Sequence, residues 1–328
     1  MRPLQQQEAV MSSRIEGTRT TLEEVFAQEA SGLTQETNKG SQEVRNYSEA
    51  LAAGLKAMAE GRPLTFSLVK ELHRVLLANV RGSDKTPGLY RTAQVWIGES
   101  ESINNIHRAR FVPPPPEHVQ PCIDELEKYL AERTEDDGLV RLALAHYQFE
   151  TIHPFNDGNG RAGRLLIVLQ SIQEKLQDRQ WLYMSPYIES RRQEYYDRLL
   201  EVSLTGNYDR WISFFLVAVR ESAAQTAEKI TDLRNLMEDY RGRLTGGTTR
   251  TPLELLNVLQ RIPYVTTSLA QLLLSVQSPR TARTAIDRLV AAGILEEVPW
   301  KHRGGMGRPA AVYRCKDIID LINRNVSI

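Results

Sequence analysis

Helical spacing of apolar residues is the feature that most constrains how this chain can fold. Apolar side chains recur three and four residues apart through most of the sequence, a spacing that places them on one face of a helix. The segments with this spacing are 44–58, 66–77, 119–130, 139–151, 161–176, 192–204, 208–236, 251–260 and 281–292. The sequence therefore predicts a mainly α-helical protein.

Alternating patterns typical of strands are few. Residues 94–97 are predicted to form one arm of a short hairpin with the segment near Phe111, and residues 295–298 to pair with residues 311–315. The four prolines at 113–116 must be extended, because proline lacks an amide donor and restricts the residue before it. We expect this run to be a rigid connector that leads into the next helix.

The composition is that of a globular protein with two or three domains: 328 residues, 41% hydrophobic and 25% charged. The N-terminus shows no apolar secretory signal, and no apolar run approaches the roughly 20 residues of a membrane-spanning helix. We therefore expect a cytoplasmic protein that does not insert into membranes. The chain has two cysteines, Cys122 and Cys315, almost two hundred residues apart, a usage that fits neither a disulfide framework nor a zinc site.

A segment rich in glycine and threonine, residues 245–249, marks a predicted domain boundary. The predicted regions are an N-terminal helical region over 1–100, a core over 101–243 and a C-terminal domain over 250–328. The net charge of the chain is zero, yet the C-terminal region holds eleven lysines and arginines against six aspartates and glutamates, a charge of +5. This basic region favours a polyanionic partner.

A loop with many chemically active residues follows the helix predicted to end near residue 151. Residues 153–164 read His-Pro-Phe-Asn-Asp-Gly-Asn-Gly-Arg-Ala-Gly-Arg. Gly158 and Gly160 permit backbone conformations closed to other residues and let a ligand approach the main chain. The free amides at the start of the next helix attract phosphate. The segment therefore predicts an anion-binding site.

The side chains of this segment add the other parts of a phosphate-transfer site. Arg161 and Arg164 lie three residues apart in the first turn of a helix, where both can bind phosphate oxygens. Asp157 offers one hard oxygen ligand, which suits Mg²⁺ because that ion takes further oxygens from phosphates and water. His153 is the loop's proton acceptor near neutral pH. The set predicts phosphoryl or nucleotidyl transfer.

The same twelve residues resemble the Fic motif, His-Pro-Phe-x-Asp/Glu-Gly-Asn-Gly-Arg-x-x-Arg, and match it at every specified position. The similarity extends over roughly residues 5–215, through 43–47, 87–98 and 194–200. It implies a Fic-type helical core with a β-hairpin flap. It also implies a protein adenylyltransferase, which moves AMP from Mg-ATP to a serine, threonine or tyrosine hydroxyl of a target protein and releases pyrophosphate.

The resemblance also implies a role for each motif residue. His153 would remove the proton of the target hydroxyl, Asp157 would hold Mg²⁺, and Phe155 would anchor the loop in the core. The flap near residues 94–98 would hold the target segment by strand addition. The nucleotide-binding residues implied are Ile97, Gly98, Gly158, Asn159, Gly160, Arg161, Gly163, Arg164 and Tyr195.

A second motif lies near the N-terminus, where residues 12–17 read Ser-Ser-Arg-Ile-Glu-Gly. Ser12 and Glu16 are four residues apart and share a helix face; alone, the pattern is typical of a helix end followed by a Thr-capped helix. It is similar to the Fic inhibitory motif, Ser/Thr-x-x-x-Glu-Gly/Asn. The resemblance implies an inhibitory helix at about residues 8–30, whose Glu16 pairs with Arg164 and takes the space of the γ-phosphate. In some relatives this glutamate also assists AMP removal, so the reverse activity stays open.

The C-terminal region shows the element order of a winged helix-turn-helix: a helix from 251, short helix 268–274, helix 279–292 and two strands. Three arginines lie on or near the predicted recognition helix, and four basic residues lie in the predicted wing, where phosphate contacts are expected. These residues are Arg280, Arg283, Arg288, Lys301, His302, Arg303 and Arg308. DNA is therefore a candidate partner, with dimerisation or docking as the alternative, and a homodimer is expected because homodimers are common among Fic relatives.

Two other functions compete with the adenylyltransferase prediction. A transcriptional regulator could use a Fic-like core to sense nucleotide, although a core without catalysis need not retain both His153 and Asp157. An enzyme with another donor would transfer UMP, phosphate or phosphocholine, as some Fic proteins do. Residues 158–160 favour AMP over the kinase-like variant, whose loop departs from this pattern.

Overall fold

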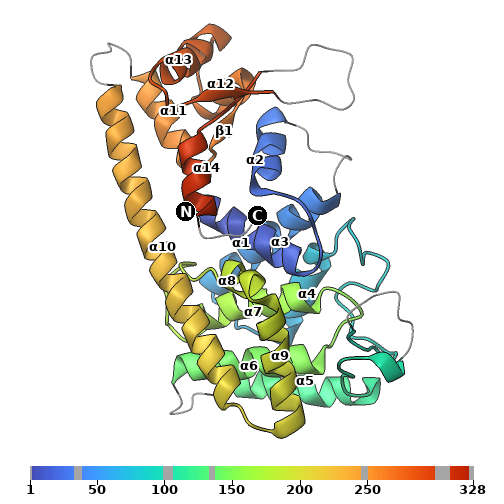
Figure 1. The fold of residues 1–328 in the computed structure, drawn as a ribbon. Coiled ribbons are helices and arrows are strands. Elements are labelled where there is room, and N and C mark those ends of the chain that lie inside the picture. Colours follow the sequence, from blue (N-terminus) through green and yellow to red (C-terminus); the bar gives the residue numbers. More distant parts are fainter. Residues whose placement is uncertain are drawn as a thin grey trace. The chain divides into compact units, whose positions relative to one another are not determined.

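The computed structural model describes residues 2–32, 39–98, 106–132, 137–244, 250–299 and 311–324. Helices dominate this part of the chain, which confirms the mainly α-helical prediction (Figure 1). The helices are α1 (Arg2–Ile15), α2 (Leu22–Ser31), α3 (Lys39–Ala59), α4 (Phe66–Leu76), the 3-10 helix η1 (Ile106–Arg108), α5 (Pro116–Ala131), α6 (Gly138–Ile152), α7 (Asn159–Gln173), α8 (Ser185–Ser190), α9 (Arg192–Thr205), α10 (Asp209–Arg243), α11 (Thr251–Leu259), α12 (Thr267–Leu273), α13 (Pro279–Ala291) and α14 (Lys316–Asn323). The strands are β1 (Tyr264–Val265), β2 (Glu296–Val298) and β3 (Val312–Arg314).

All nine segments with helical spacing are helices, shifted by a few residues at their ends. The capped helix start that follows the N-terminal motif is also confirmed. The Thr21 hydroxyl accepts a hydrogen bond from the Glu24 amide, and the Glu24 carboxylate accepts one from the Thr21 amide. Residues 8–30 therefore form two helices, because α1 ends at Ile15 before α2 begins.

The described chain forms two compact units. One unit consists of residues 11–18 and 42–223, and the other of residues 1–10, 19–41 and 224–328. Each compact unit thus contains segments that are distant in sequence. The three regions predicted from the sequence, 1–100, 101–243 and 250–328, are instead continuous segments, and this division stays a prediction. Both α1 and α10 contribute residues to each unit. No described helix is long and apolar enough to cross a membrane.

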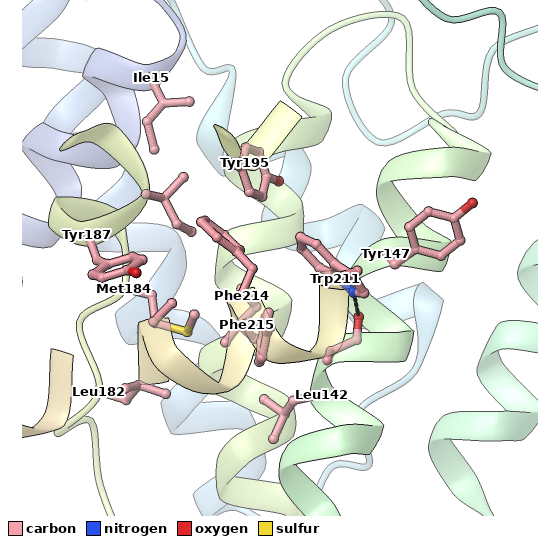
Figure 2. Close-up of a cluster of buried hydrophobic side chains, with 14 of the residues drawn as sticks. Ile15, Leu142, Tyr147, Leu182, Met184, Tyr187, Tyr195, Trp211, Phe214 and Phe215 are labelled. Atoms are coloured by element: carbon pink, nitrogen blue, oxygen red, sulfur yellow. Dashed lines mark hydrogen bonds between the residues drawn. The ribbon is translucent and has the colours of Figure 1, made fainter. Parts of the chain in front are cut away.

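In the unit that contains residues 42–223, α6 and α7 pack against each other, with α5 on α6 and α4 on α7. Aromatic residues of α10 fill the core beside α6 (Figure 2). The indole of Trp211 donates a hydrogen bond of 2.8 Å to the Ala143 carbonyl. These contacts fix α6, and α6 leads directly into the loop that begins at His153.

The predicted flap hairpin is reduced to one antiparallel bridge between Ile97 and Phe111 among the described residues. The Ile97 amide donates to the Phe111 carbonyl at 2.9 Å, and the Phe111 amide donates back at 3.1 Å. Pro115 is extended (φ −56°, ψ 150°) and leads into α5, but Pro116 is the first residue of that helix, so the predicted extended run ends one residue earlier than expected.

The second unit contains a three-stranded antiparallel sheet in the order β1-β3-β2. The predicted pairing of 295–298 with 311–315 is confirmed by the β2 and β3 register, in which Glu297 lies opposite Tyr313. The described order α11, β1, α12, α13, β2, β3 is compatible with a winged helix-turn-helix, which stays a prediction. The predicted wing residues Lys301, His302, Arg303 and Arg308 lie outside the described residues.

Candidate active site

The loop of residues 153–158 joins α6 to α7. Its first residue, His153, caps α6 in the left-handed conformation (φ 50°, ψ 59°), and its last, Gly158, precedes α7 with φ 75°. The carboxamide of Asn159 accepts a hydrogen bond from the Phe155 amide at 2.9 Å and donates to the Phe155 carbonyl at 2.8 Å. Asn159 is buried, and its side chain therefore braces the loop from within.

The loop packs against His73, a histidine that the sequence analysis did not identify as part of the site. His73 of α4 is buried, and its ring stacks on Phe155 with centroids 3.8 Å apart. Its Nδ1 accepts a hydrogen bond from the Gly88 amide at 2.9 Å, so the proton lies on Nε2, which donates to the Asp157 carbonyl at 2.8 Å. Burial lowers the pKa of His73 to about 4, which keeps the ring neutral.

Arg161 carries a buried positive charge at the start of α7. Its side chain is 0% exposed, and none of its three nitrogens has a hydrogen-bond partner among the described residues. The carboxylates of Glu43 and Asp157 lie near it, at 3.7 and 3.8 Å. A buried guanidinium is costly without acceptors for its five N–H groups. The geometry of the glycine-rich helix start therefore suits an anion that would supply those acceptors.

Asp157 lies beside this cation with its carboxylate half-buried. Its Oδ1 accepts a hydrogen bond from the Gly158 amide at 2.6 Å. Gly82 lies so close to the same carboxylate that a Cβ atom at position 82 would be 2.7 Å from Oδ2, too close for a side chain. Burial raises the pKa of this carboxyl. The described residues contain no group of three or more metal-ligating side chains. One carboxylate fits Mg²⁺ only where phosphates and water complete the coordination.

Arg164 is held by Ser12 and Glu16 of the N-terminal motif, residues 12–17. Its Nε donates to the Ser12 hydroxyl at 2.8 Å, and its Nη2 donates to the Ser12 carbonyl at 2.9 Å and the Glu16 carboxylate at 2.8 Å. Burial is the largest single influence and acts to raise the pKa of Glu16, but the charge and hydrogen bond of Arg164 together with the charge of Arg161 outweigh it, and the pKa lies below its usual value. A Cβ atom on Gly160 would lie 2.2 Å from Glu16 Oε1. The Glu16 carboxylate therefore lies directly over the glycine-rich turn.

His153 is placed to accept a proton. Its Nδ1 lies 3.3 Å from the Glu150 carbonyl, which assigns the ring proton to Nδ1 and leaves Nε2 as the acceptor. Burial lowers the pKa of His153 to about 4, so the imidazole is neutral at pH 7.

Glu150 is a second group that sequence reasoning missed. Burial raises the pKa of this carboxyl to about 7, and its Oε1 has no hydrogen-bond partner within the described part of the chain. A Cβ atom on Gly163 would lie 2.3 Å from Oε1. Gly163, predicted to contact the nucleotide, thus gives space to Glu150. A lone glutamate in an amphipathic helix carries no sequence signal for this placement.

Of the other predicted nucleotide contacts, Tyr195 lies within the core, and Ile97 and Gly98 lie at the bridge to Phe111. Tyr195 is 1% exposed and lies among the aromatic residues of the core (Figure 2). Its hydroxyl forms a hydrogen bond of 2.9 Å with His146 Nε2. This placement does not support the nucleotide contact predicted for Tyr195, because α9 turns that face into the core. Its neighbour Tyr196 is only partly buried. Ile97 is half-buried in its bridge, and Gly98 is exposed.

The fold and the site together define a class: helical proteins in which a glycine-rich loop opens a helix beside two buried arginines. Comparison with known families makes the assignment specific. The Fic/DOC family matches residues 63–171, and the Fic/DOC family N-terminal region matches residues 1–56, which together cover just over half of the chain. The chain therefore belongs to the Fic/DOC family.

Individual relatives agree with this assignment. The protein adenylyltransferase fic-1 of Caenorhabditis elegans is 35% identical over 103 residues, 31% of this chain and 18% of that protein. A probable protein adenylyltransferase of Aquifex aeolicus is 38% identical over 79 residues, 24% of this chain and 25% of that protein. The match thus spans 18% to 30% of the length of these and other curated relatives. A Fic family protein from Desulfovibrio desulfuricans G20 shares the fold, with a TM-score of 0.59, 23% identity and coverage of 96% and 87% of the two chains.

Proposed function

We propose that this protein is a protein adenylyltransferase that moves AMP from ATP to a hydroxyl group of a target protein. One observation carries the proposal: the Arg161 guanidinium is fully buried beside a glycine-rich helix start, without a hydrogen-bond acceptor among the described residues. An anionic phosphate chain supplies the missing acceptors. The names of the C. elegans and A. aeolicus relatives support AMP as the transferred group.

The chemistry follows from the positions of the charged groups. His153 Nε2 takes the proton of the target hydroxyl, and the hydroxyl oxygen forms a bond to the α-phosphorus. The bond from that phosphorus to the bridging oxygen breaks, and pyrophosphate leaves with the electron pair. Arg161 binds the phosphate oxygens and holds the leaving group. Asp157 would hold Mg²⁺, which neutralises phosphate charge when bound.

We further propose that Glu16 inhibits this reaction. Its carboxylate occupies the Arg164 donor that a terminal phosphate would need, and it lies over the turn that would bind the phosphates. A carboxylate on the same chain competes at a high effective concentration. The Glu16→Gly variant removes the competing carboxylate from Arg164 and is expected to transfer AMP faster than the wild type.

Incubation with α-labelled ATP and Mg²⁺ tests both proposals. We expect label on protein, including the enzyme itself, to increase in Glu16→Gly and to disappear in Glu16→Gly/His153→Ala. Absence of label in every form would contradict AMP transfer and would favour another donor or a nucleotide-sensing regulator. Equal labelling by wild type and Glu16→Gly would contradict the inhibition alone.

We also propose DNA as a partner of the C-terminal region, on the observation that α13 exposes Arg280 and Arg288 beside Thr284. Arg283 is less available, since it donates to Asp287 at 2.9 Å and lies over the Tyr313 ring. Fluorescence anisotropy with a duplex of mixed sequence gives the test. Replacing Arg280 and Arg288 with alanine should reduce the dependence of log affinity on log salt by about 0.9 per lost phosphate contact. An unchanged slope would favour a docking or dimerisation module.

A further inference from the structure

The residue that holds the proton acceptor in place is Arg91, a side chain outside the Fic motif. We infer that Arg91 is a positioning residue, which fixes the main chain at His153 so that the imidazole faces the reacting hydroxyl. The inference rests on the proposed AMP transfer and assigns a further residue to it. It is carried by the hydrogen bonds, the burial and the backbone conformation around residues 152–154.

The main chain at His153 needs external support. A non-glycine residue rarely adopts the left-handed conformation that His153 has, because Cβ then crowds the following carbonyl. The residue also ends α6, where the last carbonyl groups have no partners within the helix. Strain and unsatisfied carbonyls therefore coincide at the residue that carries the proton acceptor.

Arg91 satisfies three consecutive carbonyl groups at this point. Its Nε donates to the His153 carbonyl at 2.9 Å, and its Nη2 donates to the Ile152 carbonyl at 3.3 Å. The backbone amide of Arg91 donates to the Pro154 carbonyl at 2.9 Å. The planar guanidinium and the adjacent amide thus fix the direction of the peptide groups on both sides of the His153 Cα atom. A lysine ammonium has no such fork.

Arg91 also connects this loop to the base of the flap. Its Nη2 donates to the Pro114 carbonyl and its Nη1 to the Ala93 carbonyl, so both chain segments next to the Ile97 bridge share one guanidinium. Arg91 is 2% exposed, and its guanidinium donates to four carbonyl oxygens, those of Ala93, Pro114, Ile152 and His153. A buried cation without a hydrogen-bonded carboxylate is costly to keep.

The charge acts on His153 as well. Burial is the main cause of the lowered pKa of His153, and the positive charge of Arg91 lowers it further. Arg91 therefore supports the neutral imidazole in addition to the backbone conformation.

The test uses the Glu16→Gly protein as the parent, because its activity shows whether AMP transfer occurs at all. In this parent, Arg91→Lys should reduce kcat about 10- to 100-fold, since a misplaced base slows proton removal. The KM for ATP should stay within about threefold, because Arg91 does not reach the proposed phosphate-binding residues. Rates are expressed per ATP-binding site, counted by calorimetric titration, so that any unfolded fraction does not affect kcat.

Arg141 provides the matched control in the same compact unit. It is equally buried, and it donates to the Tyr129 and Glu132 carbonyls at 2.8 Å and to Glu174 at 2.9 Å, away from the loop. We expect Arg141→Lys to lower the melting temperature while kcat per binding site stays at the parent value. A kcat for Arg91→Lys equal to that of Arg141→Lys would overturn the inference.

A second variant separates the charge from the hydrogen bonds. Arg91→Gln keeps an amide donor but loses the positive charge, so the pKa of His153 should rise and the acid limb of the kcat profile should move to higher pH. An unmoved acid limb together with an unchanged kcat would also contradict the role of Arg91. If the Glu16→Gly parent itself transfers no AMP, the proposed function fails instead.

Discussion

At the scale of single residues, the end of α1 holds Arg164 through two different side chains. Ser12 accepts two of the three hydrogen bonds, one with its hydroxyl and one with its carbonyl, and Glu16 accepts the third. The carbonyl bond survives any substitution at Ser12, whereas the hydroxyl bond is lost with the side chain. Ser12 thus contributes to the inhibition proposed for Glu16 without carrying its charge.

Replacing Ser12 with alanine should activate the enzyme partly. A hydrogen bond to a charged group contributes about 1.5–3 kcal/mol, so the rate of AMP transfer should rise by roughly ten- to a hundredfold, and by less than in Glu16→Gly. Initial rates with α-labelled ATP measure this. Ser13→Ala is the control, because the buried Ser13 hydroxyl has no hydrogen-bond partner among the described residues and should change the rate little. Equal activation by both variants would contradict the specific role of Ser12.

The residues of the site differ in how far the sequence could predict them. The likeness of residues 12–17 to an inhibitory motif led to the pairing of Glu16 with Arg164, and the structure contains this ion pair at 2.8 Å. His73, Arg91 and Glu150 could not be predicted, because each comes from a helix or loop with ordinary composition. Only the packing of α4 and the flap base against loop 153–158 brings the first two to the site.

At the scale of elements, the long helices and the short helix α12 (predicted at 268–274) were predictable, whereas α8, α14 and β1 were not. The periodic segments gave α3 to α7 because several turns repeat the same apolar face. α8 has six residues and β1 has two, which is too short for any period to appear. α14 was missed since a short apolar run such as Ile318–Ile322 fits a strand as well as a helix.

Helices α4 and α6 each bury a neutral histidine, His73 and His146. We therefore expect the folded protein to lose stability as the pH falls. Burial lowers their pKa values to about 4 and about 3, below the ordinary 6.5. Between pH 6.5 and 4 the unfolded chain therefore binds protons that the folded chain does not. Each histidine should reduce the free energy of unfolding by about 1.4 kcal/mol per pH unit as the pH falls.

Urea unfolding at several pH values measures this effect. Between pH 6.5 and 4, the slope of the free energy of unfolding against pH reports the number of protons taken up on unfolding. His146→Gln should lower this number by about one, whereas His118→Gln, at an exposed position, should leave it unchanged. Glu150 acts in the opposite direction, because its raised pKa lets the folded chain bind a proton between pH 7 and 4.5. A slope that does not change in His146→Gln would contradict the burial of a neutral imidazole.

At the scale of the whole molecule, one compact unit is assembled from distant parts of the chain. Lys229 of α10 is buried and donates to the Gln7 side chain at 3.1 Å and to the Ile322 carbonyl at 2.7 Å. Gln7 and Ile322 are separated by 315 positions, yet the Gln7 amide donates to the same carbonyl. No sequence pattern indicated this grouping, because a polar contact between the two ends of a chain leaves no periodic signal.

Loss of this lysine should destabilise the unit that contains it. Lys229→Met leaves the Gln7 oxygen without its donor, a loss of about 1–3 kcal/mol. For a protein of this size that corresponds to a decrease of about 2–4 °C in melting temperature per kcal/mol. Thermal denaturation followed by circular dichroism measures the change. Lys316→Met, at an exposed position, should melt like the wild type, and a Lys229→Met protein that also does so would contradict the structural role.

The ion pair of Glu16 and Arg164 has a further consequence for how the protein responds to its own abundance. Both partners belong to one chain and to one compact unit. Opening this contact is therefore a unimolecular event, and the ratio of open to closed molecules does not change on dilution. Specific activity per molecule should accordingly be constant across protein concentrations. The total rate of AMP transfer in a cell would then rise only in proportion to the amount of this protein, unless a second molecule takes part in opening the ion pair.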